Sequence, residues 1–363
     1  MSEKLFICAK TGVYWDVVDC PLPVDLSPDM IYANIESGLE SMGYHGELST
    51  IWAYTKKVPE SEFFDYNAVG IMMVREKGDQ YDRVDRMTRD ILFFALDNPK
   101  RPTNLMIIAN NMSMKPELIR VLQSLKSRNI NVVVAQPDAL VPVELHGIVT
   151  GVCLSKSLLD GGKATMLELD PEIKNVTNLD YFQQVSKRPS YESIGNTGVF
   201  WNTKGCPDPK ALELDFCSID KSIKSCLASM DKSGSRVTSI SAYEVGGKVT
   251  VWNGGSDTKM VLHKGYRLQR MLLDILLWAI DNRVGQYLNT DREPNVMVIT
   301  RDIPKGRDFN NTLKFLSARD CNIIFGVPDE LKSVSSWTTL TVFGEPFFSS
   351  HAESIQCRDS KSL

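Results

Sequence analysis

Residues 11–16 read Thr-Gly-Val-Tyr-Trp-Asp, and the pattern returns 186 positions later (197 − 11) as Thr-Gly-Val-Phe-Trp-Asn over residues 197–202. A second pair follows at an offset of 184 (274 − 90): residues 90–98 and 274–282 share an apolar helical pattern that ends in Asp-Asn. Motifs that repeat in the same order at nearly equal spacing predict a duplicated domain.

The length of 363 residues is enough for about two average domains. The segment between the copies is polar and contains Pro171 and Pro189, which is typical of a linker. We therefore expect this organisation: domain 1 over 8–169, a linker over 170–196, domain 2 over 197–350 and a flexible tail over 351–363.

Apolar runs rich in β-branched residues alternate with stretches of helical period in both copies. This alternation predicts an α/β fold with two tandem three-layer domains and mainly parallel sheets. In copy one we expect strands near 13–18, 48–54, 69–74, 105–109 and 131–135, with helices over 29–42, 82–96 and 115–128. In copy two we expect strands near 199, 237–243, 258–262, 296–300 and 322–326, with helices near 220–230, 266–280 and 311–319. The late segments 144–169 and 330–348 are expected to add an edge strand or to close each sheet.

The composition is that of an ordinary globular protein, with 43% hydrophobic and 24% charged residues. The formal net charge of −4 provides no overall basic excess for nucleic-acid phosphates, so any such binding must use a local patch. The eight scattered cysteines include no Cys-x-x-Cys pair and there are only four histidines, which predicts neither a zinc site nor a disulfide framework.

The first ten residues lack the basic and apolar segments of a secretory signal, and no apolar run approaches the length of a membrane span. We therefore expect an intracellular protein, cytoplasmic or nuclear, with no membrane partner. The last three residues read Lys-Ser-Leu rather than the peroxisomal Ser-Lys-Leu, so a peroxisomal address is not expected.

Three motifs carry a family resemblance: the run from Gly12 to Pro21, the helix that ends over residues 90–98, and the fourth strand with the helix after it. Together they resemble the NYN domain of the PIN-like nuclease superfamily over 11–140 and 197–331. The likeness is nearest to the plant proteins related to meiosis regulator and mRNA stability factor 1. The resemblance implies a Rossmann-like fold and metal-dependent cleavage of RNA, with magnesium or manganese held by several carboxylates.

The resemblance implies an aspartate at the end of the first strand, one early on the third helix, and an Asp-x-Asp-like turn after the fourth strand. Copy one keeps the first as Asp16, but Val84 stands at the helix position with Asp85 one residue away. Amides and a hydroxyl, including Asn111, follow the fourth strand. If copy one is active, we expect its catalytic residues to be Asp16, Asp85, Asp90 and Asn111. For Asp90, a structural hydrogen-bonding role is an equal alternative.

Copy two has Asn202 in place of the first aspartate and Leu268 at the helix position, and it retains Asp302. Neither copy holds the full acidic set. One hypothesis therefore combines Asp16 with Asp302 as metal ligands across a contact between the two domains. The alternative for Asp16 is a hydrogen-bonding role at the end of its strand.

Basic residues flank the third helix of each copy, and they predict a rim that contacts RNA phosphates. The alternative is a solvated helix face paired with neighbouring aspartates. The candidates for RNA binding are Arg83, Arg86, Arg89, Lys264, Arg267 and Arg270.

The incomplete acidic sets favour an RNA-associated protein on a tandem NYN scaffold that has lost catalysis and acts in RNA metabolism or gene regulation by binding. One alternative is an active endoribonuclease that uses magnesium or manganese in domain 1. The other is a protein-interaction scaffold in which the copies bind each other or a protein partner.

Overall fold

The computed structural model divides the chain into two compact units, Met1–Arg188 and Pro189–Leu363. The domain and linker boundaries expected from the sequence stay predictions. The structure describes residues 3–56, 60–76, 78–98, 102–112, 115–167, 196–204, 223, 225, 227–228, 236–243, 248–253, 257–262, 267–285, 293–300, 306–330 and 333–342.

Unit 1 contains a six-stranded parallel sheet in the order β3-β2-β1-β4-β5-β6. This is the order of a doubly wound Rossmann-like fold, in which the order of strand addition reverses between β1 and β4. The strands are β1 (Lys10–Asp16), β2 (Leu48–Thr55), β3 (Ile71–Arg75), β4 (Thr103–Ile108), β5 (Ile130–Gln136) and β6 (Gly151–Leu154). The helices are α1 (Glu3–Phe6), α2 (Pro28–Ser41), α3 (Glu60–Ala68), α4 (Gln80–Asp97), α5 (Pro116–Lys126), the 3-10 helix η2 (Val143–Leu145) and α6 (Ser155–Leu159).

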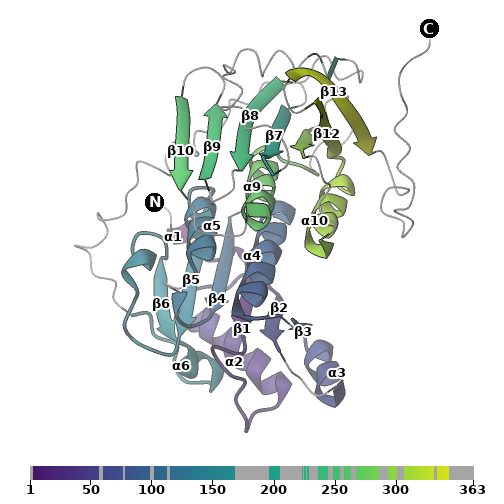
Figure 1. Ribbon diagram of the computed structural model, residues 1–363. Helices are drawn as coiled ribbons and strands as arrows, with labels where there is room; N and C mark the ends of the chain where they lie inside the picture. Colours follow the sequence, from purple (N-terminus) through teal and green to yellow (C-terminus); the bar gives the residue numbers. More distant parts are fainter. Residues whose placement is uncertain are drawn as a thin grey trace. The chain divides into compact units, whose positions relative to one another are not determined.

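Helices cover both faces of the unit 1 sheet (Figure 1). Trp15 faces a core cluster with Ile31 of α2, Tyr66 of α3 and Leu158 of α6. Successive side chains of a strand point to opposite faces, so Tyr14 faces the other layer, where its hydroxyl donates to the backbone oxygen of Asp90 on α4. Helix α5 packs against α4. Asp16 has the parity of Tyr14 and therefore lies on the face of α4 and α5.

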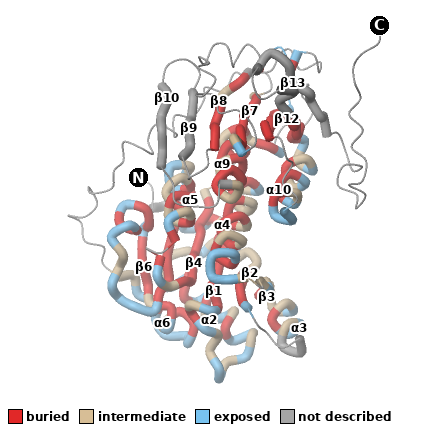
Figure 2. Tube along the Cα trace, in the orientation of Figure 1, coloured by how far each residue is buried: buried red, intermediate tan, exposed pale blue. Residues whose placement is uncertain are grey.

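The central strands are buried over nearly their whole length (Figure 2), which explains why residues 105–108 of β4 and 132–135 of β5 are continuously apolar rather than alternating. Local sequence fixes where the long helices begin. Asp79 and Asp82 form a capping box at the start of α4, and Ser27 caps α2 just before Pro28.

Unit 2 contains a seven-stranded sheet in the order β10-β9-β8-β7-β11-β12-β13. Its four central strands, β8, β7, β11 and β12, are parallel, whereas β9, β10 and β13 pair antiparallel. The strands are β7 (Asn196–Asn202), β8 (Arg236–Tyr243), β9 (Lys248–Asn253), β10 (Asp257–Leu262), β11 (Asn295–Ile299), β12 (Asn322–Glu330) and β13 (Ser333–Val342). The helices with bounds in the described part of unit 2 are α9 (Arg267–Asp281) and α10 (Arg307–Ser317), and residues 223, 225, 227 and 228 are also helical.

The α/β prediction with two mainly parallel sheets is confirmed, and β6 and β13 add an edge to their sheets as expected. One detail differs between the units. Unit 1 reaches the parallel strand β3 through helix α3, whereas unit 2 forms the antiparallel pairs β8–β9 and β9–β10 in that place. The strand near 258–262 therefore exists and runs in the same direction as its counterpart in unit 1, but β9 lies between it and β8.

The same hydrogen-bonded side chains join the amino-terminal ends of the central strands in both units. In each unit, an asparagine on β4 or β11 donates a hydrogen bond from its side-chain amide to a threonine on the neighbouring strand, β1 or β7. An asparagine on β5 or β12 donates in turn to the side-chain oxygen of that asparagine. The residues are Thr11, Asn104 and Asn131 in unit 1 and Thr197, Asn295 and Asn322 in unit 2. This shared buried network supports the duplication.

The glycine of each repeated motif leaves room for an aromatic ring of the helix above it. A Cβ atom on Gly12 would lie 3.0 Å from the Phe94 ring, and one on Gly198 would lie 2.6 Å from the Trp278 ring. The ring of Phe94 packs edge-on against Tyr14, and that of Trp278 packs edge-on against Phe200. The glycine therefore sets the distance between strand and helix in each unit.

We predict that Gly198→Ala destabilises unit 2 by about 2–3 kcal/mol and that Gly12→Ala destabilises unit 1 by about 1 kcal/mol, because the added methyl overpacks the closer ring more severely. Urea unfolding of the full chain measures both. Gly306→Ala is the comparison without overpacking, since no described atom lies within 4 Å of a Cβ atom there, and its smaller cost is that of alanine at the N-cap of α10. Equal stability of the Gly198→Ala and Gly306→Ala variants would contradict the prediction.

Candidate functional site

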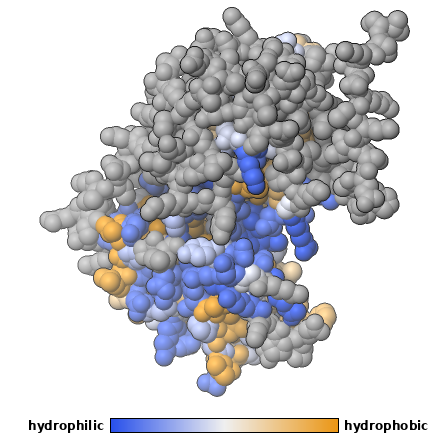
Figure 3. Space-filling model, in the orientation of Figure 1, coloured by the Kyte–Doolittle hydropathy of each residue, from blue (hydrophilic) through white to orange (hydrophobic). Residues whose placement is uncertain are grey.

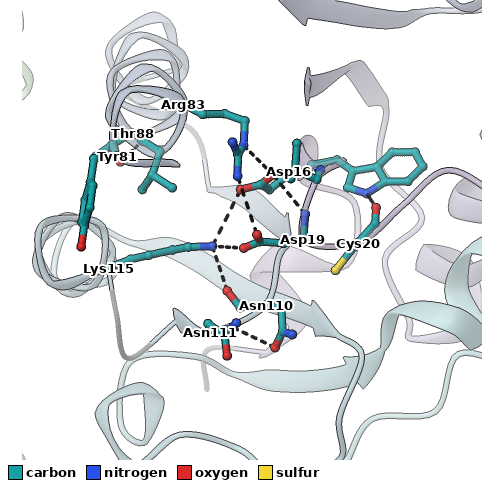
Figure 4. Close-up of polar contacts among 12 residues, drawn as sticks. Asp16, Asp19, Cys20, Tyr81, Arg83, Thr88, Asn110, Asn111 and Lys115 are labelled. Atoms are coloured by element: carbon teal, nitrogen blue, oxygen red, sulfur yellow. Dashed lines mark hydrogen bonds and ion pairs between the residues drawn. The ribbon is translucent and has the colours of Figure 1, made fainter. Parts of the chain in front are cut away.

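Polar side chains gather at the carboxyl edge of the unit 1 sheet, beyond the ends of β1 and β4. In doubly wound sheets this reversal point is where ligands bind. Asp16 and Asp19 come from the end of β1 and the turn after it. Arg83 comes from the first turns of α4, and Lys115 is the N-cap residue of α5 (Figure 4). These four residues are called the ion cluster below.

Asp16 organises the turn after β1 and binds α4. Its Oδ1 accepts hydrogen bonds from the backbone N–H groups of Val18 at 3.1 Å and Asp19 at 3.3 Å. The same oxygen accepts from Nε of Arg83 at 2.7 Å. Arg83 also places Nη2 3.7 Å from Oδ1 of Asp19. One carboxylate therefore joins a strand end, a turn and a helix.

Lys115 brings α5 into the same cluster. Its Nζ donates to Oδ2 of Asp19 at 2.5 Å and to the backbone oxygen of Asn110 at 2.8 Å. It lies 3.9 Å from Oδ2 of Asp16. The ammonium group is thus surrounded by three oxygens (Figure 4).

The ion cluster is shielded from solvent and formally neutral. The side chains of Asp16, Arg83 and Lys115 are 1%, 2% and 3% exposed, and that of Asp19 is 11% exposed. Burying a charge is costly unless a partner compensates it, and here two cations offset two carboxylates. Among the described residues, Oδ2 of Asp16 and Nη1 of Arg83 have no hydrogen-bond partner.

The ion cluster does not fit a divalent metal ion as it stands. Magnesium and manganese require several oxygen ligands that are not already neutralised. Within the described part of the chain, no three histidine, cysteine, aspartate or glutamate side chains come together as metal ligands. The two carboxylates that do meet are each bound by a guanidinium or an ammonium group. The predicted metal pair of Asp16 with Asp302 stays untested, because residue 302 lies outside the described residues.

The other predicted catalytic residues do not all join Asp16. Oδ2 of Asp90 accepts from the Tyr54 hydroxyl at 2.8 Å and from Nε of Arg86 at 3.0 Å. Asp85 is half-buried on α4. Asn111 is exposed after β4 in a left-handed conformation, with φ of 50°.

The contacts of Asp90 recur in unit 2. Oδ2 of Asp274 accepts from the Tyr243 hydroxyl at 3.0 Å and from Nε of Arg270 at 2.9 Å. The recurrence favours the structural alternative for this aspartate, which fastens the helix to the second strand of its sheet. Its catalytic role stays a prediction.

The predicted basic rim is mostly buried where the structure describes it. Arg83 and Arg89 are 1% and 4% exposed, and Arg270 is 8% exposed and paired with Asp274. The Arg86 side chain is 35% exposed. Lys264 and the side chain of Arg267 lie outside the part of the chain that the structure describes. The contact of these residues with RNA stays a prediction, and among the described ones Arg86 offers the most accessible guanidinium.

Sequence analysis missed Asp19 and Lys115 as members of the site. Asp19 lies within the family-like run, three residues after Asp16, so that spacing was an available signal. Lys115 precedes Pro116, which marks a helix start, but no sequence signal shows that its ammonium group returns to the end of β1.

At the equivalent position in unit 2, the uncharged side chain of Asn202 organises the turn. Oδ1 of Asn202 accepts from the backbone N–H of Lys204 at 3.2 Å, as Asp16 accepts from Val18. Its Nδ2 donates to the Thr300 hydroxyl at 3.3 Å. The N-cap residue of α10 is Gly306, where α5 has a lysine. The amide thus makes the first hydrogen bond of the turn, and as a neutral group it needs no cation to balance it.

The family model of the NYN domain matches residues 10–146. The chain contains an NYN domain. This matched stretch spans β1 to β5 and all four residues of the ion cluster, and NYN domains are PIN-like ribonuclease domains. No curated protein matches the chain, so the nearer likeness to plant proteins and the second NYN copy stay predictions. No described helix is long and apolar enough to cross a membrane.

The Cys20 thiol lies beside the ion cluster with a raised pKa. Its pKa rises from an ordinary 9.0 to about 12, mainly because the thiol is buried. A hydrogen bond with Ser155 lowers the pKa in part, and the charges of Asp19 and Asp16 raise it again. The thiol is therefore protonated at neutral pH and is a poor nucleophile.

We predict an alkaline loss of stability from Cys20. Between pH 9 and 12 the folded state keeps a proton that the unfolded state releases, so stability is complete below pH 9 and falls as pH rises. From pH 9 to about 10.5 the loss is ~2 kcal/mol from this one group. Urea unfolding at pH 8 and about 10.5 should show a smaller loss for Cys20→Ala than for wild type. The exposed Cys8→Ala is the control, and equal losses for wild type and Cys20→Ala would refute the assignment.

Proposed function

We propose that this protein associates with single-stranded RNA through its NYN domain and does not cleave it, so that it acts in RNA metabolism by binding. The observation that carries the proposal is the engagement of Asp16, the aspartate expected in the family's metal site, by Arg83 and Lys115. A carboxylate that is 1% exposed and held by a guanidinium group is poorly placed to bind a metal ion.

Residues around the ion cluster support RNA rather than an apolar partner. Tyr81, at the start of α4, is 60% exposed, and aromatic side chains in such positions stack on unpaired bases. Asn111 is exposed after β4 and presents an amide, which hydrogen-bonds base edges. The visible described surface of unit 1 is mainly hydrophilic, with small apolar patches (Figure 3).

The proposal predicts that the full chain retards labelled single-stranded RNA at low salt and leaves its length unchanged when MnCl2 is present. Tyr81→Ala should weaken binding by about 5- to 100-fold, because one stacked base contributes about 1–3 kcal/mol. Phe64→Ala is the matched control: Phe64 is 75% exposed and lies on α3, in the opposite helical layer from Tyr81.

Two results would overturn the proposal in different ways. Shortening of the RNA by wild type but not by Asp16→Asn would establish the alternative of an active metal-dependent endoribonuclease. The absence of any retardation at low salt would remove the RNA role and favour the protein-interaction scaffold.

A further inference from the structure

We propose that the Lys115 ammonium group takes the place of a divalent cation at Asp16 and Asp19, so that removing it turns the two carboxylates into a site for Mn²⁺ or Mg²⁺. This proposal deepens the proposed function, because it gives a cause for the absence of cleavage. Its test involves no RNA, so either proposal can fail while the other stands.

The surroundings of Nζ are those of a hard cation. Its two hydrogen bonds run to a carboxylate oxygen of Asp19 and to the backbone oxygen of Asn110, and a carboxylate oxygen of Asp16 lies 3.9 Å away. Carboxylate and backbone carbonyl oxygens are ligands that Mg²⁺, Mn²⁺ and Ca²⁺ use. The chain thus presents its own cation to an oxygen-lined position.

An unpartnered atom points to the same position. Oδ2 of Asp16 belongs to a residue that is fully buried, yet among the described residues it has no hydrogen-bond partner. The Lys115 ammonium group is the charge 3.9 Å from it. A smaller, doubly charged ion placed between Asp16 and Asp19 would satisfy an oxygen that the lysine does not hydrogen-bond.

The carboxylates of Asp16 and Asp19 explain why a lysine can stand at the N-terminus of α5. It is the N-cap residue of α5 and its side chain makes no capping hydrogen bond. A positive charge at a helix N-terminus is unfavourable because the helix dipole is positive there. Asp16 and Asp19 compensate this, and Pro116 at the first helical position fixes the start of the helix.

In unit 2, uncharged residues stand at the positions that correspond to Asp16, Asp19 and Lys115. Asn202 replaces Asp16, and Gly306 occupies the N-cap place of Lys115. At the repeat offset of 186, glycine also stands in place of Asp19 (19 + 186 = 205). The joint replacement is expected if the lysine is needed only where the carboxylates are present, because a buried lysine without them would be uncompensated.

The test is thermal unfolding of the full chain with EDTA or with about 5 mM MnCl2. Wild type should unfold at the same temperature in both. Lys115→Ala should unfold about 10 °C lower with EDTA, because it leaves buried carboxylates undercompensated. Adding MnCl2 should restore about half of that loss.

Two variants control the test. Asp19→Asn with Lys115→Ala should recover stability without metal and lose the response to MnCl2, because one carboxylate has been neutralised. Lys126→Ala changes another lysine of α5, whose Nζ donates to the backbone oxygen of Gly147, and should show no response to metal.

Either of two outcomes would overturn the proposal: a MnCl2 response in wild type as large as in Lys115→Ala, or a destabilised Lys115→Ala that MnCl2 leaves unchanged. If Lys115→Ala does not fold, electron paramagnetic resonance of Mn²⁺ with wild type decides the question. The free-ion signal should persist undiminished, and stoichiometric binding that Asp16→Asn abolishes would show that lysine does not fill the site.

Discussion

The hydrogen bond between Nε of Arg83 and Oδ1 of Asp16, 2.7 Å long and almost fully buried, is the interaction on which unit 1 depends. It binds α4 to the end of β1, and Lys115 binds α5 to the same place through Asp19. Losing one partner of such a buried pair typically costs about 3–5 kcal/mol, because the other charge stays buried without compensation. The helical layer over the carboxyl edge is therefore held by charges that balance one another.

The two units agree at the amino-terminal edge of the sheet and differ at the carboxyl edge. At the amino-terminal ends of the strands, both retain the same threonine and asparagine hydrogen bonds. At the carboxyl edge, unit 1 has a neutralised ion cluster, whereas in unit 2 the uncharged Asn202 takes the place of Asp16. Hydrogen bonds that hold neighbouring strands together are needed in any copy of the fold. The charges at the carboxyl edge are needed only for the function of the site at that edge.

Sequence pattern predicted most of the fold because burial controls periodicity. The apolar runs 105–108 of β4 and 132–135 of β5 and the Gly-aromatic motif around Gly12 can be recognised in the sequence. Charged residues were harder to place. Arg83 and Arg89 have the spacing of an exposed helix face, yet both are buried. Which side of α4 faces the sheet edge is set by tertiary packing, and the pairing of Asp19 with Lys115 spans 96 residues. Local periodicity predicts neither the orientation of α4 on the sheet nor a contact between residues so far apart in the sequence.

The central claim is that the NYN domain supplies its own cations to Asp16, the carboxylate expected to hold a metal ion, and to its neighbour Asp19. The most direct measurement is anomalous X-ray scattering from a crystal of the full chain soaked in MnCl2. The account predicts no manganese peak beside Asp16, with the Lys115 ammonium group still on Asp19. A manganese peak coordinated by Asp16 and Asp19, with Lys115 displaced, would contradict it.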